Sequence, residues 1–492
     1  MSFSQKLSAI LHSRIFALIT SIFASAVVFV SVGILVKQNI INNYTITRQS
    51  DLVSLIKPSI VKVVTSTSGK VTYPDFRFNA DTLELEVVTP KKGPNEKAFS
   101  NDDAYGTGFI VDDSGYILTN AHVATIGILK DSFVTQIYNA AVDELEARLS
   151  KSKNPKEKAL YEKYSTFSDD DWKPIYEKGY RVVWDNLDTS GVFQQIAVVD
   201  PLFDSSNFDE QIGHSFPATI VKANEEFLFD DKDIALIKIE KNNLPTISID
   251  DETPVSEGER IIIAGYPSSA DTGTSANKAS ITSGIVSSLK DSENIKFKYF
   301  EVDAKVAPGS SGSPVIDSNG HVIGILTEQS NALYLAGSGD NFAYAIPINE
   351  AKEYYKDVID NKRLYETNFK RGLAYYHYGQ CKEAALNFGN AGQSDENFIK
   401  NSDIGSYLSS CKPRSAVGLI QDVGFVPFVV TFVIMLLFIT SVWFWKKDIF
   451  LEAKINEEEK EIREIEQYIK NGKQGEETKV INGNDEQKQK HE

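Results

Sequence analysis

Residues 307–315, APGSSGSPV, contain the serine of this chain that is best suited to nucleophilic chemistry. Alternating glycine and serine is typical of a flexible linker. Here, however, the run lies between two strand-like segments, YFEVDAKV and IDSNGHVIGIL, and a linker inside one core would be unusual. The alternative is a tight turn whose glycines let backbone N–H groups face a substrate, with Ser311 as a nucleophile.

A serine nucleophile needs a base to remove its proton and a carboxylate to orient that base. Only His122 directly follows two strand-like segments, in GTGFIVDDSGYILTNAHV. Asp233 immediately precedes the apolar segment IALIKI, which can shield its carboxylate, whereas we expect Asp230 and Asp231 to be solvated. Alone, such a histidine or aspartate is more often structural. The order His122, Asp233, Ser311 is that of chymotrypsin-like enzymes. The other histidines lie in less suitable contexts: His12, His214, His321, His377 and His491.

Several segments together resemble HtrA/Deg-type trypsin-like serine peptidases. They are GTGFIVDDSGYILTNAHV, DIALIKI, AGYP, ITSGIVSS, APGSSGSPV, GHVIGIL and FAYAIPI, in the order that this family shows. The resemblance covers about residues 52–348 apart from an insertion. It implies a double β-barrel with the active site between the barrels, His122 as general base, Asp233 as its orienting partner and Ser311 as nucleophile. It also implies that the N–H groups of Gly309 and Ser311 form the oxyanion hole.

Three features depart from the family pattern. Residues 309–313 read Gly-Ser-Ser-Gly-Ser, with Ser313 where glycine is usual, and we expect this to be tolerated. Lys305 lies six residues before Ser311, at the position that floors the specificity pocket of trypsin-like enzymes. An inward ammonium would favour an acidic substrate side chain, but Lys305 could instead pair with Glu328 or extend into solvent. No PDZ-like segment follows the peptidase region.

The sequence also predicts the elements that position this site. We expect a mainly β domain over 50–348, with a charged, helix-favouring insertion over about 131–214. Residues 349–412 read as an α-helical tetratricopeptide-like region, because Gly372, Tyr375, Ala384, Phe388 and Ala391 match that repeat; a plain amphipathic hairpin is the alternative.

The composition excludes some partners and cofactors. A net charge of −17, without a basic cluster, argues against nucleic-acid binding. The only cysteines, Cys381 and Cys411, form no CxxC pair, so we expect neither a metal nor a cofactor. They are expected on adjacent helices, where an extracytoplasmic disulfide would contribute about 3 to 4 kcal/mol.

Two charge-free segments predict transmembrane helices over 15–36 and 423–445, each long enough for about 30 Å of bilayer. For 15–36 a buried helix and a signal peptide cleaved near ASA are the alternatives. Lys6, Arg14, Lys446 and Lys447 place the N-terminus (1–14) and the charged tail (446–492) in the cytoplasm. The peptidase and repeat regions would then face the extracytoplasmic side. Isoleucines in the tail fit either a short coiled coil or a solvated amphipathic helix.

The sequence therefore predicts a two-pass membrane serine endopeptidase acting on extracytoplasmic proteins or peptides, in envelope quality control. The repeat region is expected to offer a surface for a protein partner, and the chain to form a homo-oligomer. The alternative is a catalytically idle membrane scaffold that binds partners through its β domain and repeat. The intact triad favours the enzyme, and the long insertion, which could cover the cleft, favours the scaffold.

Overall fold

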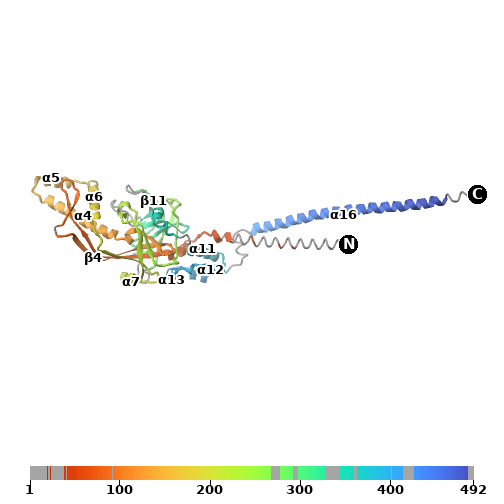
Figure 1. The fold of residues 1–492 in the computed structure, drawn as a ribbon, viewed down its shortest axis with the longest axis horizontal. Coiled ribbons are helices and arrows are strands. Elements are labelled where there is room, and N and C mark those ends of the chain that lie inside the picture. Colours follow the sequence, from red (N-terminus) through yellow and green to blue (C-terminus); the bar gives the residue numbers. More distant parts are fainter. Residues whose placement is uncertain are drawn as a thin grey trace, which may run out of the picture. The chain divides into compact units, whose positions relative to one another are not determined.

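The computed structural model (Figure 1) describes residues 41–90, 92–267, 277–291, 297–327, 343–359, 363–400 and 402–413, the helix 426–485 and a few single residues before residue 41. The chain divides into two units. Tyr44–Pro413 form one, and Met1–Asn43 with Arg414–Glu492 form the other. Both barrels and all the predicted site residues belong to Tyr44–Pro413.

The first barrel is a closed ring of six antiparallel strands that carries His122 and Asp233 next to its strand ends. Its interior is filled by side chains such as Val63, Ile117 and Ile237, none of which is exposed. In ring order the strands are β1 (Ile60–Tyr73), β4 (Asn95–Asp112), β5 (Tyr116–Thr119), β8 (Ala235–Ile239), β7 (Ser215–Ala223) and β6 (Val192–Val199).

The second barrel carries Ser311 and also closes through six strands, because β13 pairs with both β10 and β14. A two-residue strand, β9 (Ser248–Ile249), adds to β14 in parallel. The ring order is β10 (Arg260–Gly265), β11 (Ser280–Asp291), β12 (Lys298–Val302), β15 (Ala343–Pro347), β14 (His321–Thr327) and β13 (Pro314–Ile316). The predicted double β-barrel is thus confirmed.

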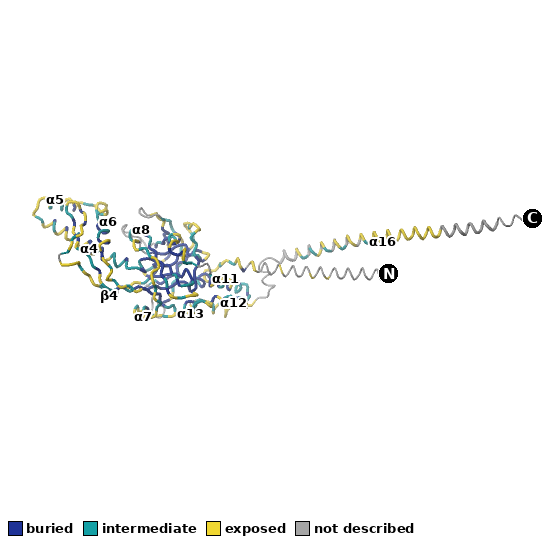
Figure 2. Tube along the Cα trace, viewed as in Figure 1, coloured by how far each residue is buried: buried dark blue, intermediate teal, exposed yellow. Residues whose placement is uncertain are grey.

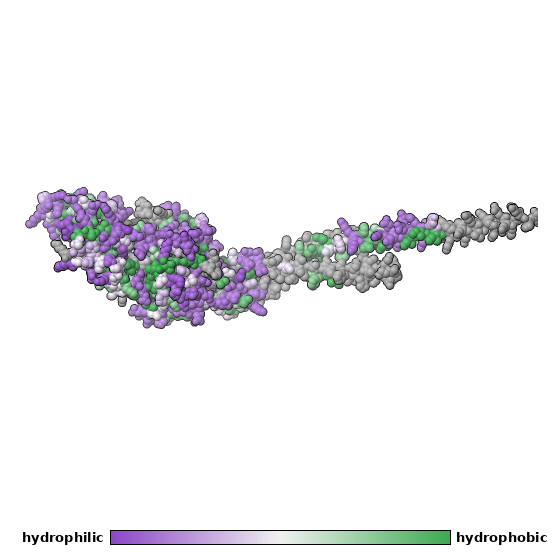
Figure 3. All heavy atoms as spheres, in the orientation of Figure 1, coloured by the Kyte–Doolittle hydropathy of each residue, from purple (hydrophilic) through white to green (hydrophobic). Residues whose placement is uncertain are grey.

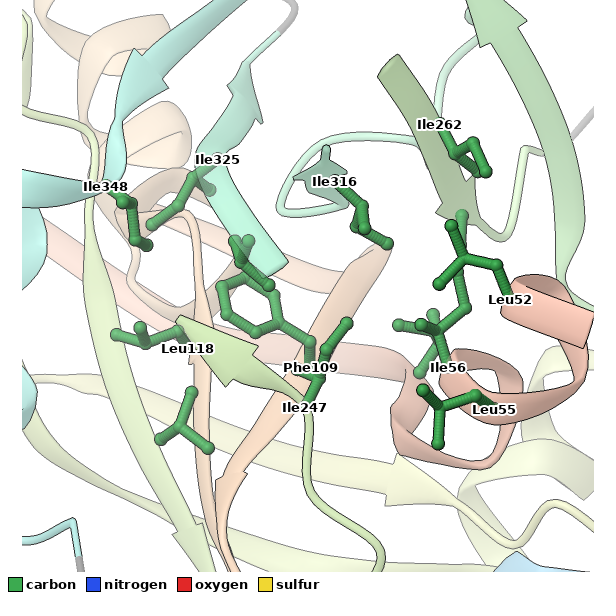
Figure 4. Packing of buried hydrophobic residues seen from close by; sticks show 14 of the residues in the cluster. Leu52, Leu55, Ile56, Phe109, Leu118, Ile247, Ile262, Ile316, Ile325 and Ile348 are labelled. Carbon is green, nitrogen blue, oxygen red and sulfur yellow. The ribbon is translucent and has the colours of Figure 1, made fainter. Parts of the chain in front are cut away.

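A shared apolar core joins the two barrels. Figure 4 shows Phe109 and Leu118 of the first barrel facing the same cluster as Ile316 and Ile325 of the second. Helix α2 (Gln49–Ile56) adds Leu52 to this cluster and leads through a short 3-10 helix, η1 (Lys57–Ser59), into β1. The barrels are therefore packed as one body, whose buried core is visible in Figure 2.

The first barrel carries an extra lobe, which we call the insertion subdomain and define as residues 70–98 and 127–187. Strands β1 and β4 remain paired from Lys70↔Ala98 to Tyr73↔Asn95, beyond the last pairing of β1 with the barrel strand β6, and lead to the β2–β3 hairpin (Asp75–Phe78 and Leu85–Val88). Three helices pack on it: α4 (Gly127–Ser150), α5 (Pro155–Tyr164) and α6 (Asp169–Asn186). Together they bury a separate apolar core, at the end of this unit far from α11 and α12 in Figure 1.

The predicted insertion of 131–214 is wrong at its C-terminal boundary. Strand β6 lies inside that range, yet it pairs with β1 from Val63↔Val198 to Gly69↔Val192 and with β7. It is therefore an indispensable barrel strand rather than irregular surface chain. Only the short helix α7 (Phe208–Gly213) and its loops lie outside the barrel between β6 and β7. The lobe also includes the 70–98 excursion, which the sequence did not assign to it.

The segment after β15 is helical, as predicted, and packs on the inter-barrel core. A Cβ added to Gly372 would lie 2.6 Å from the Phe388 ring, which is why the two central helices can approach so closely. Cys381 and Cys411 are joined by a disulfide, with their Cα atoms 5.8 Å apart. Whether this region is a tetratricopeptide repeat stays a prediction. Its elements are η4 (Ile348–Ala351), α10 (Lys352–Tyr355), α11 (Leu364–His377), α12 (Cys381–Ala391), α13 (Glu396–Ile399) and α14 (Ile404–Ser410).

The second unit contains α16 (Val426–Asp485), which includes most of the predicted span 423–445 and continues into the charged tail. Among the residues that the structure describes, no helix meets the length and hydropathy that membrane crossing requires. The predicted span 15–36 lies almost wholly outside those residues. Both spans, and the orientation derived from them, therefore stay predictions.

Candidate active site

His122 and Asp233 meet at one end of the first barrel. His122 lies in the one-turn helix α3 (Ala121–Ala124), directly after β5, and Asp233 directly precedes β8. Because β5 and β8 are antiparallel neighbours, with Thr119 opposite Ala235, these two positions come together. The Nδ1 atom of His122 lies 2.5 Å from Oδ2 of Asp233, and the His122 backbone N–H donates to Oδ1 at 2.9 Å.

The Asp233 carboxylate is shielded and fully engaged. It is 3% exposed, and the Thr327 hydroxyl at the end of β14 donates to its Oδ2 at 3.1 Å. The Asn120 side-chain amide donates to the Asp233 carbonyl at 2.7 Å. When Nδ1 of His122 donates to Asp233, Nε2 is left as an acceptor, which is the tautomer a general base needs. The sequence does not mark Thr327, because no local pattern shows that β14 reaches the first barrel.

Ser311 lies in a loop of the second barrel that packs against the strand and turn preceding His122. A Cβ added to Gly312 would lie 2.1 Å from the Thr107 carbonyl and 3.2 Å from the Asn120 nitrogen. Gly309 and Gly312 have φ of +95° and +84°, a conformation that strongly favours glycine. The structure thus places the predicted nucleophile loop at the barrel junction, beside the His122 segment. Ser311 itself is 3% exposed.

The loop leaves two backbone donors available. The Ser310 N–H closes a turn onto Ala307 O at 2.9 Å, and the Ser313 N–H donates to Ser310 O at 3.0 Å. In the part of the chain that the structure describes, the N–H groups of Gly309 and Ser311 have no acceptor. Paired N–H groups beside a nucleophile are what an oxyanion hole requires.

The Ser313 hydroxyl, at a position where glycine is usual, gains no hydrogen bond from the described residues. The Ser313 side chain is fully buried, and its Oγ would lie 2.0 Å from a Cβ built on Gly265. An unpaired buried hydroxyl is destabilising. Gly265 is the residue that leaves room for it.

We expect Ser313→Ala to increase the free energy of unfolding by about 1 kcal/mol, because it removes that unpaired group with little change of volume. Urea unfolding of the two proteins measures this difference. The matched control is Ser114→Ala, which removes a hydroxyl that is bonded to Asp112 and should not stabilise the fold. A loss of stability in Ser313→Ala would contradict the prediction.

Two other sequence expectations have different outcomes. Lys305 is exposed, and Glu328, its possible partner, lies outside the described residues, so the role of Lys305 in specificity stays a prediction. Asp230 is exposed as predicted, but the prediction for Asp231 is wrong. Asp231 is 8% exposed and adopts a left-handed conformation with φ of 56°, while Tyr299 donates to its carbonyl at 2.8 Å. That left-handed turn after α8 (Phe227–Asp230) folds Asp231 inward.

Parts of this chain are similar to known serine proteases. The family model of the trypsin-like peptidase domain matches residues 190–325, from β6 to β14. A probable periplasmic serine endoprotease, DegP-like, of Halomonas elongata is 30% identical over 133 residues, or 27% of this chain and 25% of the relative. A serine protease of Staphylococcus aureus, HtrA-like, is 26% identical over 198 residues, or 35% of this chain and 25% of the relative.

The chain thus spans about a quarter of the length of these relatives. A solved serine endoprotease of Yersinia pestis aligns with 65% of this chain and 70% of its own at 18% identity, but its TM-score of 0.32 is too low to support an argument. The family model and the names of the curated relatives both indicate serine proteases. Residues 190–325 thus match a trypsin-like peptidase domain, and the chain is similar in part to HtrA-type serine proteases.

Proposed function

We propose that this protein is a serine endopeptidase that hydrolyses peptide bonds of protein substrates through His122, Asp233 and Ser311. The observation that carries the proposal is the shielded His122–Asp233 pair, 2.5 Å apart, at the same barrel junction as a serine loop with two available N–H donors. A base with its orienting carboxylate, a serine and paired N–H donors are the groups that serine acyl transfer requires, which supports the proposal.

In the proposed reaction, Ser311 Oγ bonds to the substrate carbonyl carbon while its proton passes to Nε2 of His122. Asp233 stabilises the resulting imidazolium through Nδ1–H. The N–H groups of Gly309 and Ser311 bind the oxyanion. When the intermediate collapses, the C–N bond breaks and the amine leaves with the His122 proton. Water then adds to the acyl-enzyme with His122 again as base, which releases the acid and regenerates Ser311.

The proposal is tested by treating the purified full-length protein with a fluorophosphonate probe and with casein. We expect covalent labelling at Ser311 and cleavage of casein. A catalytically idle scaffold would do neither, even though it retained the fold.

We also propose that segments 15–36 and 423–445 anchor the protein in a membrane, with Tyr44–Pro413 on the extracytoplasmic side. The charge-free segments support it, and so does the Cys381–Cys411 disulfide, because such bonds persist in oxidising compartments. In that location the substrates would be envelope proteins, consistent with a role in quality control. The exposed α12 side chain of Leu386, 66% exposed, would be part of the partner surface of the helical region.

We expect protease added to intact cells to reach Tyr44–Pro413 but not the tail after Lys447. Charge bias around the two spans is the physical reason. An epitope placed after His491 and one placed in the exposed turn at Ser318 provide the two readouts and control for each other. Degradation of the tail epitope with survival of the other would invert the orientation.

A further inference from the structure

Thr107 lies between the two barrels, in the segment GTGF that precedes the His122 hairpin. It is on β4 of the first barrel, opposite Lys62 of β1, and it is completely buried. Its N–H and its hydroxyl bond to the second barrel, and its carbonyl accepts a hydrogen bond from β5 of the first. Nothing in the reaction described above uses it.

The direction of its hydroxyl proton is fixed by its partners. The backbone N–H of Tyr266, which can only donate, lies 2.9 Å from Thr107 Oγ1. The hydroxyl must accept that bond, so its own proton is directed to the carbonyl of Gly309, also 2.9 Å away. Thr107 Oγ1 thus links two segments of the second barrel through one buried atom.

The backbone of Thr107 holds the same loop a second time. Its N–H donates to Ser311 O at 2.8 Å, and its carbonyl accepts the Thr119 hydroxyl at 2.7 Å. The carbonyls of Gly309 and Ser311 are therefore both bonded to one residue of the opposite barrel. The N–H groups of the same two residues have no acceptor in the described structure.

A glycine needs such an anchor more than other residues do. Gly309 has φ of +95° and no side chain, so its neighbouring peptide groups can rotate at low steric cost. Its surroundings leave no space for a side chain, because an added Cβ would lie 2.5 Å from Tyr266 O and 3.0 Å from the Tyr105 ring. The orientation of the loop must therefore come from hydrogen bonds. Thr107 Oγ1 supplies the bond to the Gly309 carbonyl.

We propose that Thr107 is a positioning residue for transition-state stabilisation: its hydroxyl fixes the Gly309 carbonyl and so keeps the N–H groups of Gly309 and Ser311 directed at the oxyanion. This inference rests on the proposed peptidase function. It assigns a catalytic consequence to a residue that touches neither the substrate nor the His122–Asp233 pair. Because the oxyanion exists only after attack, Thr107 should affect turnover rather than substrate binding.

The test compares Thr107→Val, which keeps the shape and loses the hydroxyl, with Thr107→Ser, which keeps the hydroxyl, in the full-length protein. Loss of one direct oxyanion donor lowers kcat by about 10²–10³-fold, so we expect loss of its support to lower kcat by about 10- to 100-fold. KM should stay within about twofold, and Thr107→Ser should recover kcat to within about threefold of the parent. Thr246→Val, which alters a buried threonine of the segment between the barrels, is the control and should retain parent kcat.

A peptide aldehyde gives a second readout. Ser311 Oγ bonds to the aldehyde carbon, the hydroxyl proton passes to His122, and the carbonyl oxygen becomes an oxyanion in the same site. The affinity of the protein for the aldehyde should fall in Thr107→Val by the same factor as kcat. Its affinity for the corresponding peptide alcohol, which forms no oxyanion, should stay unchanged.

The outcomes separate the two proposals. If the parent neither cleaves peptide nor reacts with fluorophosphonate, the peptidase function is wrong and this inference falls with it. If the parent is active and Thr107→Val has parent kcat, only the inference is wrong. It is also wrong if kcat, KM and the thermal midpoint all change together and Thr107→Ser does not rescue them, because that pattern indicates a purely structural role.

Discussion

Replacing Ser311 by alanine is expected to abolish fluorophosphonate labelling and to lower kcat/KM for a peptide substrate by about 10⁴-fold or more. The substitution removes the proposed nucleophilic oxygen, while the buried loop keeps its backbone hydrogen bonds. His122→Ala should be nearly as severe, because the hydroxyl would then have no base. Rates of peptide hydrolysis and in-gel fluorescence of the labelled protein measure both effects.

The chain offers a matched pair of controls outside the site. Ser318 is an exposed serine in the turn after β13, and His321 lies 3.9 Å from the Asp317 carboxylate, so it forms a second histidine–aspartate pair. Ser318→Ala and His321→Ala should keep parent labelling and turnover. Labelling that survives in Ser311→Ala would move the nucleophile elsewhere. Full activity in His122→Ala would exclude the proposed triad.

The candidate residues of this site could be selected from the sequence because a local motif marks each of them. His122 follows a hairpin, Asp233 precedes an apolar strand, and Ser311 lies in a glycine-rich turn, so short motifs and their order were sufficient. Thr327 and Thr107 could not be assigned in the same way. Their roles depend on the second barrel packing against the first, and that contact has no signature within either segment.

The contrast between local motifs and contacts of distant segments also explains why β6 was wrongly assigned to the insertion. The sequence VFQQIAVV becomes continuously apolar only in its second half, and charged helical chain precedes it, so it read as part of the insertion. Its assignment to the barrel comes from pairing with Ser66 and Thr67 of β1, more than 120 residues earlier. Likewise, residues 70–98 have strand character, but only the structure shows that they leave the barrel and share a core with α4 and α6. The hydrophobic periodicity of a segment does not reveal which distant strand it pairs with.

The insertion subdomain contacts the segments on both sides of the His122–Asp233 pair. Helix α4 begins at Gly127, directly after α3, and a Cβ added to Gly127 would lie 2.3 Å from the Phe227 ring. That ring has its centroid 6.4 Å from the His122 ring. Two residues later, Phe229 packs against Trp184 of α6 at 5.4 Å. The lobe therefore contacts the chain segments that carry His122 and Asp233.

The face of the peptidase unit visible in Figure 3 is mainly hydrophilic, and most of its atoms over α5 and α6 are purple. An apolar core covered by a largely polar surface fits a stably folded lobe rather than a collapsed loop. Loop-closure entropy rises slowly with length, so such an insertion costs the barrel little stability. A docking surface and a lid beside the proposed active site are the two hypotheses to test for this lobe.

Two deletions should separate the barrel from the insertion subdomain. Replacing residues 131–210 by a short Gly/Ser loop removes β6, so β1 and β7 lose their shared neighbour, and we expect no folded, labelled protein. Replacing 128–186 and 71–97 together by short loops retains every barrel strand and removes both halves of the subdomain core. Removing α4–α6 alone would expose Phe76, Phe78 and Leu85 of the hairpin, so we expect that variant to aggregate.

The double replacement should therefore give a soluble Tyr44–Pro413 unit that still labels at Ser311, while its turnover of casein relative to a small peptide ester changes by at least about fivefold, equivalent to about 1 kcal/mol. A fall in that ratio identifies the subdomain as a docking surface, because only the protein substrate reaches it. A rise identifies a lid that had restricted large substrates. A ratio equal to that of the parent, in a variant that labels normally, would show that the lobe neither binds nor screens substrates.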